Sequence, residues 1–370
     1  MNDSAGVHRP GPAAPGSRDA RSPAGVGADV TVVIPTFNRS HGVERALRAL
    51  ADQTAQGFAV VVVDNSSTDD TQERMAAQVG AWAGRLAYVR KVPEGPASAR
   101  NVGLDAARSS YVLFHDSDVE LPPDWLERAL AHMAANPALG VVGGYLLYGF
   151  DPGRVNAYGG DLGRMGLAWD FCEGTPLDAT QGPVDRIWIN CSVILVRAQP
   201  ARAAGGFDGR FFYGFEDSDF GWRLCLAGHR SRVFPDLIAL HHVDANPGLA
   251  HAQMVFHYCK NRLCSMIKNA AGAHLPWMLA GYLSYTLADL ALRAPRRSKL
   301  AALMWNLRNL RETLALRRAV QATRTITDRE VFALGSGRWF PAVPLAGRRR
   351  RPDGSTRSSA SDSAAADDRL

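Results

Sequence analysis

Short apolar segments alternate with helix-forming segments over residues 30–115, and this alternation restricts the fold more than any other feature of the chain. Val30–Ile34, Phe58–Val63 and Tyr111–His115 are rich in β-branched and aromatic residues, which is typical of buried strands. Ser40 can cap a helix in which apolar residues recur at helical spacing, namely Val43, Ala46, Leu47 and Leu50. Similar patterns predict helices from about residue 68 and at 97–108, and a strand near 86–90.

Strands with near-continuous apolar sequence are buried on both faces, since an exposed face would carry polar residues at every second position. The pattern therefore predicts an α/β fold with a mainly parallel sheet and helices on both of its faces. In such sheets, ligands bind beyond the carboxyl ends of the strands. Candidate functional residues are therefore expected in the segments 35–39, 64–67 and 116–118.

The rest of the chain is expected to form three further parts. The glycine-rich and aromatic segment 140–245 completes the first domain, which spans 29–248, although its elements cannot be assigned from the pattern. Residues 249–335 are expected to be helical. Residues 1–28 and 336–370 lack apolar periodicity, and their Gly, Ala, Pro, Ser and Arg content is typical of disordered tails.

Asp116 and Asp118 directly follow one of the predicted strands. Two carboxylates at positions i and i+2 can bind one hard cation if the backbone turns there, and Mg²⁺ and Mn²⁺ prefer such oxygen ligands and share them with phosphates. The alternative is a polar turn at the strand end, because Asp and Ser are common turn formers.

A second polar segment, 64–69, lies at the same predicted edge of the sheet. Asp64 can accept hydrogen bonds from a base or ribose, and hydroxyls such as that of Ser66 can bind polar edges; Asx turns and helix capping explain the same residues. Arg100 and Asn101 lie in the first turn of a predicted helix, a position that favours phosphate binding, while a surface arginine is the alternative.

A second acidic cluster, Glu216, Asp217 and Asp219, precedes the helical pattern that ends at Gly228. Helix capping explains one such acid, but three exceed what a cap needs, so one carboxylate is a candidate general base for an acceptor hydroxyl. The helix N-terminus is expected to keep this base ionised.

His241 and His242 follow an apolar stretch; an adjacent histidine pair indicates a metal more than a lone histidine does.

These segments together resemble glycosyltransferase family 2. The resemblance covers about residues 29–245 and rests on five motifs in the family's order: 32–39, 63–69, 99–103, 114–118, and 205–208 followed by 215–219. It implies the GT-A fold, which is Rossmann-like, a nucleoside-diphosphate sugar as donor, and transfer with inversion at the anomeric carbon. One departure is His115, where an apolar residue is commoner in the family.

The resemblance also implies roles for individual residues. Around the nucleoside it places Pro35, Thr36, Asn38, Arg39 and Asp64; near the donor phosphates or ribose, Arg100 and Asn101. A divalent metal, Mg²⁺ or Mn²⁺, would be held by Asp116 and Asp118, with His241 as a third ligand and His242 as the close alternative. In the Glu216-Asp217 pair, the second member is the implied base.

The net charge of +6 is concentrated in the second half of the chain, in arginines near residues 293–299, 308–318 and 348–351. Since these residues are not interleaved with aromatic side chains, an anionic membrane surface is a better partner than nucleic acid. Leu275–Leu292 is mostly apolar, and Leu300 to Leu314 form one apolar helical face. Such helices lie in a membrane interface, pack on the first domain or mediate oligomerisation.

The sequence thus predicts an inverting, metal-dependent hexosyl or deoxyhexosyl transferase for a glycan, glycolipid or other small acceptor in surface-polysaccharide assembly. Five cysteines without a CxxC pair and the lack of an apolar signal at the N-terminus favour the cytoplasm, with peripheral attachment to the membrane. A nucleotidyltransferase and a non-catalytic sugar-nucleotide-binding module are the alternatives.

Overall fold

A computed structural model describes residues 29–177, 182–243 and 249–339. The expected tails therefore lie outside the described residues, apart from 336–339. The elements that precede residue 140 in the chain alternate as the sequence predicts. They are β1 (Val30–Thr36), α1 (Ser40–Ala51), β2 (Ala59–Asp64), α2 (Thr71–Ala81), β3 (Leu86–Arg90), α3 (Pro96–Ala106), β4 (Tyr111–His115), β5 (Val119–Glu120), α4 (Trp125–Ala135) and the start of β6 (Leu139–Tyr148).

The second part of the chain adds strands that the sequence pattern did not reveal. They are the remainder of β6, then β7 (Asp151–Ala157), β8 (Gly160–Leu162), β9 (Ala168–Asp170), β10 (Val184–Arg186), β11 (Val193–Arg197) and β12 (Arg230–His241), with α5 (Ala198–Ala203) and α6 (Glu216–Leu226) between the last two. The large sheet has the order β10-β12-β6-β11-β4-β1-β2-β3, with β5 and β7 attached at its side.

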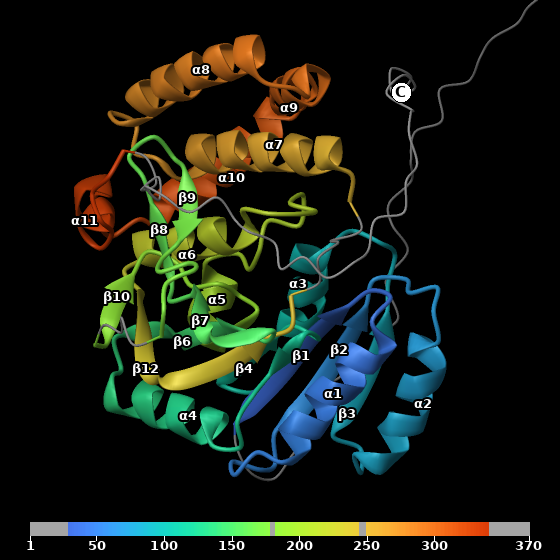
Figure 1. Ribbon diagram of the computed structural model, residues 1–370. Coiled ribbons are helices and arrows are strands. Elements are labelled where there is room, and N and C mark those ends of the chain that lie inside the picture. The colour runs from blue at the N-terminus through green and yellow to red at the C-terminus, as the bar shows by residue number, and fades with distance from the viewer. Residues whose placement is uncertain (1–28, 178–181, 244–248, 340–370) are drawn as a thin grey trace, which may run out of the picture.

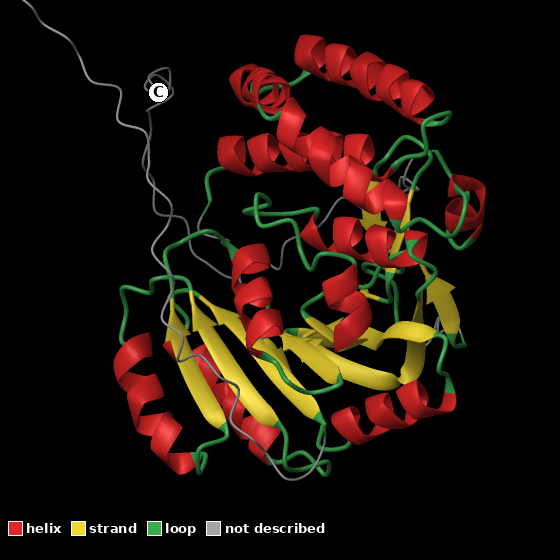
Figure 2. Cartoon of the chain, turned by 180° about the vertical axis from the view of Figure 1, so that it is seen from behind, coloured by secondary structure: helices red, strands yellow, loops and turns green. Residues whose placement is uncertain are grey.

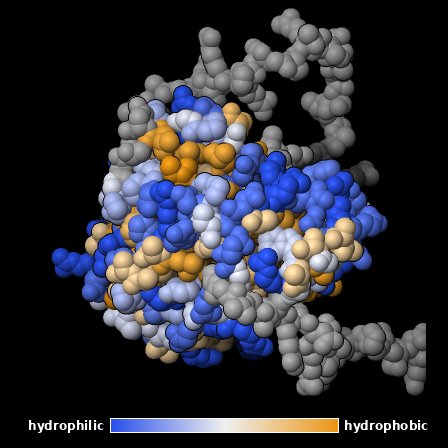
Figure 3. Space-filling view, turned by 90° about the horizontal axis from the view of Figure 1, so that it is seen from below, coloured by the Kyte–Doolittle hydropathy of each residue, from blue (hydrophilic) through white to orange (hydrophobic). Residues whose placement is uncertain are grey.

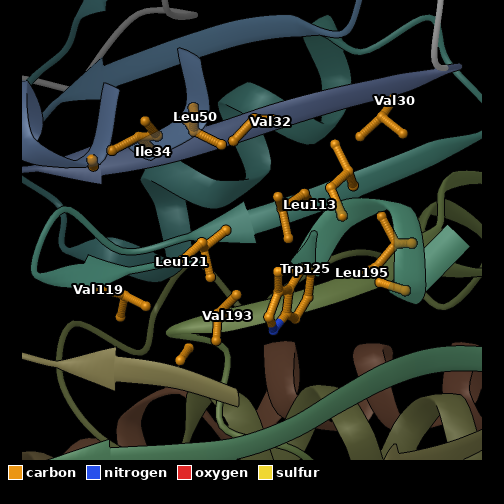
Figure 4. Packing of buried hydrophobic residues seen from close by; sticks show 14 of the residues in the cluster. Val30, Val32, Ile34, Leu50, Leu113, Val119, Leu121, Trp125, Val193 and Leu195 are labelled. Atoms are coloured by element: carbon orange, nitrogen blue, oxygen red, sulfur yellow. The ribbon is translucent and has the colours of Figure 1, made fainter. Parts of the chain in front are cut away.

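The sheet is parallel over β4-β1-β2-β3 and mixed beyond β4, because β11 runs antiparallel to both β4 and β6. Helices lie against both faces (Figure 2). One buried cluster joins β1, β4 and β11 to α1 and α4, as Figure 4 shows for Ile34, Leu113 and Trp125. The second cluster joins Val33 and Phe114 to helices α3, α5 and α6 on the other face. Alternate residues of β1 thus enter different cores, which explains its continuous apolar sequence.

The remaining helices form a separate layer beyond the sheet (Figure 1). They are α7 (His251–Asn269), α8 (Leu275–Leu292), α9 (Arg296–Arg308), α10 (Leu310–Ala322) and α11 (Asp328–Ala333). Helix α7 is the base of this layer, because Lys268 near its end lies 2.7 Å from Asp208 and 3.0 Å from Asp219 of α6. Helix α8 lies outermost and buries only Met278, Tyr282 and Thr286, one stripe at intervals of four residues.

Within the described ranges, no helix combines the length and apolar character required to cross a bilayer. All five cysteines lie within those ranges as free thiols.

Candidate active site

The two candidate metal-binding aspartates lie at the end of β4, where two further strands bring a histidine beside them. Strand β5 pairs with β12, so that Val119 is opposite His241. His241 Nε2 consequently lies 3.5 Å from Asp118 Oδ1, while its Nδ1 is 2.8 Å from Asn156 Oδ1. With Nδ1 as the donor to Asn156, a neutral His241 carries its lone pair on Nε2, the form that binds metals, whereas a protonated His241 pairs with Asp118 through the same nitrogen.

The other histidine, His242, lies outside this group. Its ring contacts Glu120 at 3.0 Å near the surface, and its backbone N–H donates to the carbonyl of Asp118 at 2.8 Å. Of the two alternatives, the structure therefore brings His241 to the aspartates.

Two arginines neutralise the aspartate pair. Arg39 forms an ion pair with Asp118, and Arg100 Nη2 lies 2.8 and 3.0 Å from the two oxygens of Asp116. Burial alone would raise the pKa of Asp118, but the hydrogen bonds and charges of His241 and Arg39 outweigh it and hold that pKa at about 2. Asp118 is therefore an anion at any physiological pH.

A divalent cation fits the chemistry of these donors, which are two carboxylates and an imidazole nitrogen. In the described ranges, however, no three His, Cys, Asp or Glu side chains lie close enough together to enclose a metal. Asp118 and His241 lie 3.5 Å apart, and Arg39 and Arg100 supply positive charge beside the two aspartates.

The second acidic pair, Glu216 and Asp217, begins helix α6. Arg100 Nη1 lies 3.7 Å from both Glu216 Oε1 and Asp217 Oδ1, so one arginine, only 3% exposed, links both acidic clusters. Helix α3 packs tightly on the sheet, since a Cβ at Gly103 would meet the side chain of Val33 at 2.2 Å. This packing positions Arg100, one helical turn before Gly103, in contact with Asp116, Glu216 and Asp217. In this structure Arg100 contacts acids, and its expected position near the donor phosphates stays a prediction.

Burial changes the ionisation of this pair. The pKa of Glu216 rises to about 7, mainly through burial and then through repulsion by Asp217. Burial also raises the pKa of Asp217; Arg100 opposes this rise and Asp116 adds to it. Burial therefore opposes the stabilising effect of the helix N-terminus on the Asp217 carboxylate, and the expectation that Asp217 is ionised stays a prediction. A carboxylate with a raised pKa is a better proton acceptor near neutral pH.

The third acid of the cluster points elsewhere. Asp219 is fully buried and accepts hydrogen bonds from Ser265 and Asn269 of α7 in addition to its ion pairs with Arg223 and Lys268. Its role is to join α6 to α7.

The candidate nucleoside residues form two linked loops at the end of the parallel strands. The Asn38 N–H donates to Ser67 Oγ at 2.8 Å, and Asn38 Oδ1 accepts from the Thr68 N–H at 2.7 Å. Asn38 and Ser66 have left-handed φ angles of 51° and 68°, unusual for residues other than glycine. Such strain is concentrated at functional sites. Pro35 and Thr36 are buried at the end of β1, next to Arg39.

Two residues that were predicted to bind the donor make hydrogen bonds within the protein instead. Asp64 is 0% exposed, and its Oδ1 accepts from the N–H and Oγ of Ser67 at 2.8 and 2.6 Å. The Asx-turn alternative thus describes Asp64 in this structure. The Asn101 side chain exchanges two hydrogen bonds of 2.8 Å with the backbone of Phe207 and lies apart from the acidic clusters.

Sequence reasoning missed the segment before β11. Asp116 N–H donates to the carbonyl of Ser192 at 2.7 Å, and Cys191 N–H donates to Asp217 Oδ2 at 3.2 Å. The segment carries no catalytic motif; its only signal is a group of polar residues beside an apolar strand. Asn156, which orients His241, has no sequence signal.

Comparison with known proteins supports the resemblance. Residues 31–163 match the model of the family described as glycosyl transferase family 2. Over this segment the chain is similar to glycosyltransferase family 2, as its motifs predict. The pre-mycofactocin glycosyltransferase of Mycobacterium tuberculosis is 32% identical over 58% of this chain and 42% of its own length. The N-acetylglucosaminyl-diphospho-decaprenol L-rhamnosyltransferase of the same organism is 27% identical over 73% of this chain and 96% of its own. The chain thus spans less than half of the first relative.

Comparison with solved structures supports the fold assignment. The crystal structure of GalNAc-T7 with UDP, GalNAc and Mn²⁺ superposes with a TM-score of 0.56 over 69% of this chain and 50% of the other, at 15% identity. The large sheet with helices on both faces forms a GT-A fold, and the C-terminal helical layer follows it, as the sequence predicts.

Proposed function

We propose that this protein is an inverting, metal-dependent family 2 glycosyltransferase. It would move a hexosyl or deoxyhexosyl group from a nucleoside-diphosphate sugar to a hydroxyl of a glycan, glycolipid or other small acceptor in cell-surface polysaccharide assembly. The observation that carries the proposal is the position of Arg100, which contacts both Asp116 and Asp217. Through it, the candidate donor-binding acid and the candidate base lie next to each other at one end of the sheet.

In the proposed reaction, an acceptor hydroxyl attacks the anomeric carbon from the face opposite the diphosphate. The new C–O bond forms as the bond to the diphosphate oxygen breaks, Asp217 takes the hydroxyl proton, and the nucleoside diphosphate leaves. Arg39 and Arg100 favour the negative charge that develops on the leaving group. A divalent cation held by Asp116, Asp118 and His241 would supply Lewis-acid stabilisation of the same charge.

Peripheral contact with an anionic membrane is part of the proposal. The mycobacterial relative is named for N-acetylglucosaminyl-diphospho-decaprenol, a lipid-linked sugar. In this chain, the outer face of α8 exposes Trp277 by 76% and Leu292 by 80%, and the adjacent Arg293 side chain is also exposed. Exposed aromatic and aliphatic side chains next to arginine are typical of helices that lie in a membrane interface.

The test is nucleoside-diphosphate release from a panel of UDP-, GDP- and dTDP-sugars, with Mg²⁺ or Mn²⁺ and with EDTA. We expect metal-dependent release with at least one donor and its loss in Asp118→Ala. Asp217→Asn should abolish transfer while donor affinity, measured by calorimetry, is retained. Asp124→Ala, which removes a half-exposed aspartate outside the site, is the matched control.

Three outcomes would contradict the proposal. Pyrophosphate release from a nucleoside triphosphate and a sugar 1-phosphate, without nucleoside-diphosphate release from any sugar nucleotide, would establish the nucleotidyltransferase alternative. Donor binding without any release would establish the binding module. Retained turnover in Asp217→Asn would remove that residue from the role of base.

A further inference from the structure

Asp170 is a carboxylate at the acidic clusters to which neither the sequence motifs nor the proposed reaction gives a role. It is the last residue of β9, in the β8–β9 hairpin that lies between the sheet and α7 in Figure 1. The hairpin is fixed at this end, because Asp170 pairs with Gly160, whose N–H donates to the carbonyl of Trp188 at 2.8 Å.

Three consecutive residues connect Asp170 to the proposed catalytic acids. The Asn190 side chain hydrogen-bonds the Asp170 carboxylate, the Cys191 N–H binds Asp217, and the Ser192 carbonyl binds the Asp116 N–H. The charges of Asp217 and His241 also act on Asp170. Asp170 therefore belongs to the same site as the proposed base.

One oxygen of Asp170 is left without a partner. Oδ1 is buried and receives no hydrogen bond within the part of the chain that the structure describes. The same is true of Oε2 of Glu216, whose residue is 9% exposed. Buried acceptors without donors are costly, and native proteins satisfy nearly all of them with protein, water or ligand. Two such oxygens beside Asp217 indicate a ligand that brings several O–H donors.

The aromatic ring of Tyr258 lies near these two unpaired oxygens. Tyr258 of α7 is 49% exposed, and its ring meets Phe215 edge-on at 6.2 Å, directly before Glu216. Tyr258 also interacts electrostatically with Asp170, Glu216 and Asp217. Pockets that combine an apolar or aromatic surface with a few convergent polar groups orient small ligands. A pyranose suits this combination, since its C–H face is apolar and its hydroxyls donate hydrogen bonds.

We propose that Asp170 binds the acceptor, and that the acceptor is a sugar ring rather than a simple alcohol. A hydroxyl next to the attacking one donates to Asp170 Oδ1, and the ring packs on Tyr258. This inference rests on the proposed transferase function and narrows its acceptor class.

The experiment uses the full chain and the sugar nucleotide that shows nucleoside-diphosphate release in water. The acceptor probes are octyl pyranosides of gluco, galacto, manno and N-acetylglucosamine configuration, with octan-1-ol as the monohydric control. We expect one pyranoside to accelerate release and octan-1-ol to have no effect. Asp170→Asn should raise the KM for that pyranoside about tenfold or more, since a hydrogen bond to a buried carboxyl oxygen is lost.

Two further comparisons separate acceptor binding from a structural role. Removal of the neighbouring hydroxyl from the active pyranoside should raise KM in the wild type but not in Asp170→Asn, because both changes delete the same contact. Asp124→Asn, which removes a half-exposed carboxylate outside the site, should leave KM unchanged.

Failure of this inference is distinct from failure of the transferase function. Nucleoside-diphosphate release that no pyranoside accelerates, or an unchanged KM in Asp170→Asn, would overturn the inference and leave the transferase proposal standing. Absence of release with every donor would overturn both.

Discussion

At the scale of single residues, the site is a set of carboxylates that share too little positive charge. Arg100 contacts Asp116, Glu216 and Asp217 at once. Since one positive charge serves three carboxylates, the ionisation of each carboxylate makes ionisation of the others less favourable. Burial adds to this effect, and Glu216 consequently has a pKa of about 7 instead of the 4.5 of an exposed glutamate.

This shift predicts a pH dependence of stability. Between pH 4.5 and 7, the folded protein keeps a proton on Glu216 that the unfolded chain loses, so this group lowers the free energy of unfolding as pH rises. Glu216→Gln mimics the protonated form and removes the effect. We expect the variant to gain stability over wild type by up to about 3 kcal/mol from pH 4.5 to 8, measured by urea denaturation. Glu73→Gln, on the exposed side of α2, is the control. A constant difference across this range would contradict the shift.

At the scale of elements, the parallel strands were predictable and the mixed half of the sheet was not. Strands β1, β2 and β4 are continuous apolar runs because both of their faces are buried. Strand β6 contains Gly143 and Gly144, and a Cβ at Gly144 would meet the carbonyl of Leu237 at 1.8 Å. Gly144 allows the close approach of β12, a contact between segments more than 90 residues apart that local periodicity does not encode. Pro235 lies in the irregular stretch of β12 between Phe234 and Ile238, which further obscures the pattern.

The candidate site was likewise predictable only where a local sequence pattern marks its residues. Asp116, Asp118 and the Glu216-Asp217 pair follow from their positions at a strand end and a helix start. The orientations of Asp64 and Asn101 depend on tertiary partners, Tyr88 and Phe207, which no local pattern indicates. Asp170 ends a three-residue strand with no motif around it.

The junction between α6 and α7 gives a prediction at this scale. Lys268 is 2% exposed and bridges Asp208 and Asp219, so Lys268→Met leaves two buried carboxylates with less positive charge. We expect a loss of about 3 kcal/mol in the free energy of unfolding. The control is Arg128→Met, which breaks a half-exposed pair with Asp124 and should cost less than about 1 kcal/mol. Equal losses from the two variants would show that the junction does not depend on this lysine.

At the scale of the whole molecule, the two ends differ in character. Helix α8 lies at the far side of the helical layer from the sheet, and its outward residues include Trp277, Leu283, Leu287 and Leu292. The view from below, in Figure 3, shows mainly hydrophilic residues with separate apolar groups on the opposite face. Since α7 connects α8 to the site through Lys268 and Tyr258, attachment through α8 would hold the site close to lipid-linked substrates.

This arrangement predicts that α8 controls binding to membranes. The wild type should sediment with vesicles that contain phosphatidylglycerol, and less with pure phosphatidylcholine, because exposed arginines follow the apolar face. Trp277→Ser combined with Leu287→Ser should weaken binding about tenfold or more, since burial of each large apolar side chain contributes about 1.5–3 kcal/mol. Val92→Ser combined with Phe150→Ser, which removes exposed apolar residues from loops of the α/β domain, should leave binding unchanged. If the α8 variant still binds, the membrane contact lies elsewhere. If it instead turns a wild-type dimer into a monomer in analytical ultracentrifugation, this face joins two copies of the chain, because the same apolar side chains then pack against each other rather than against lipid.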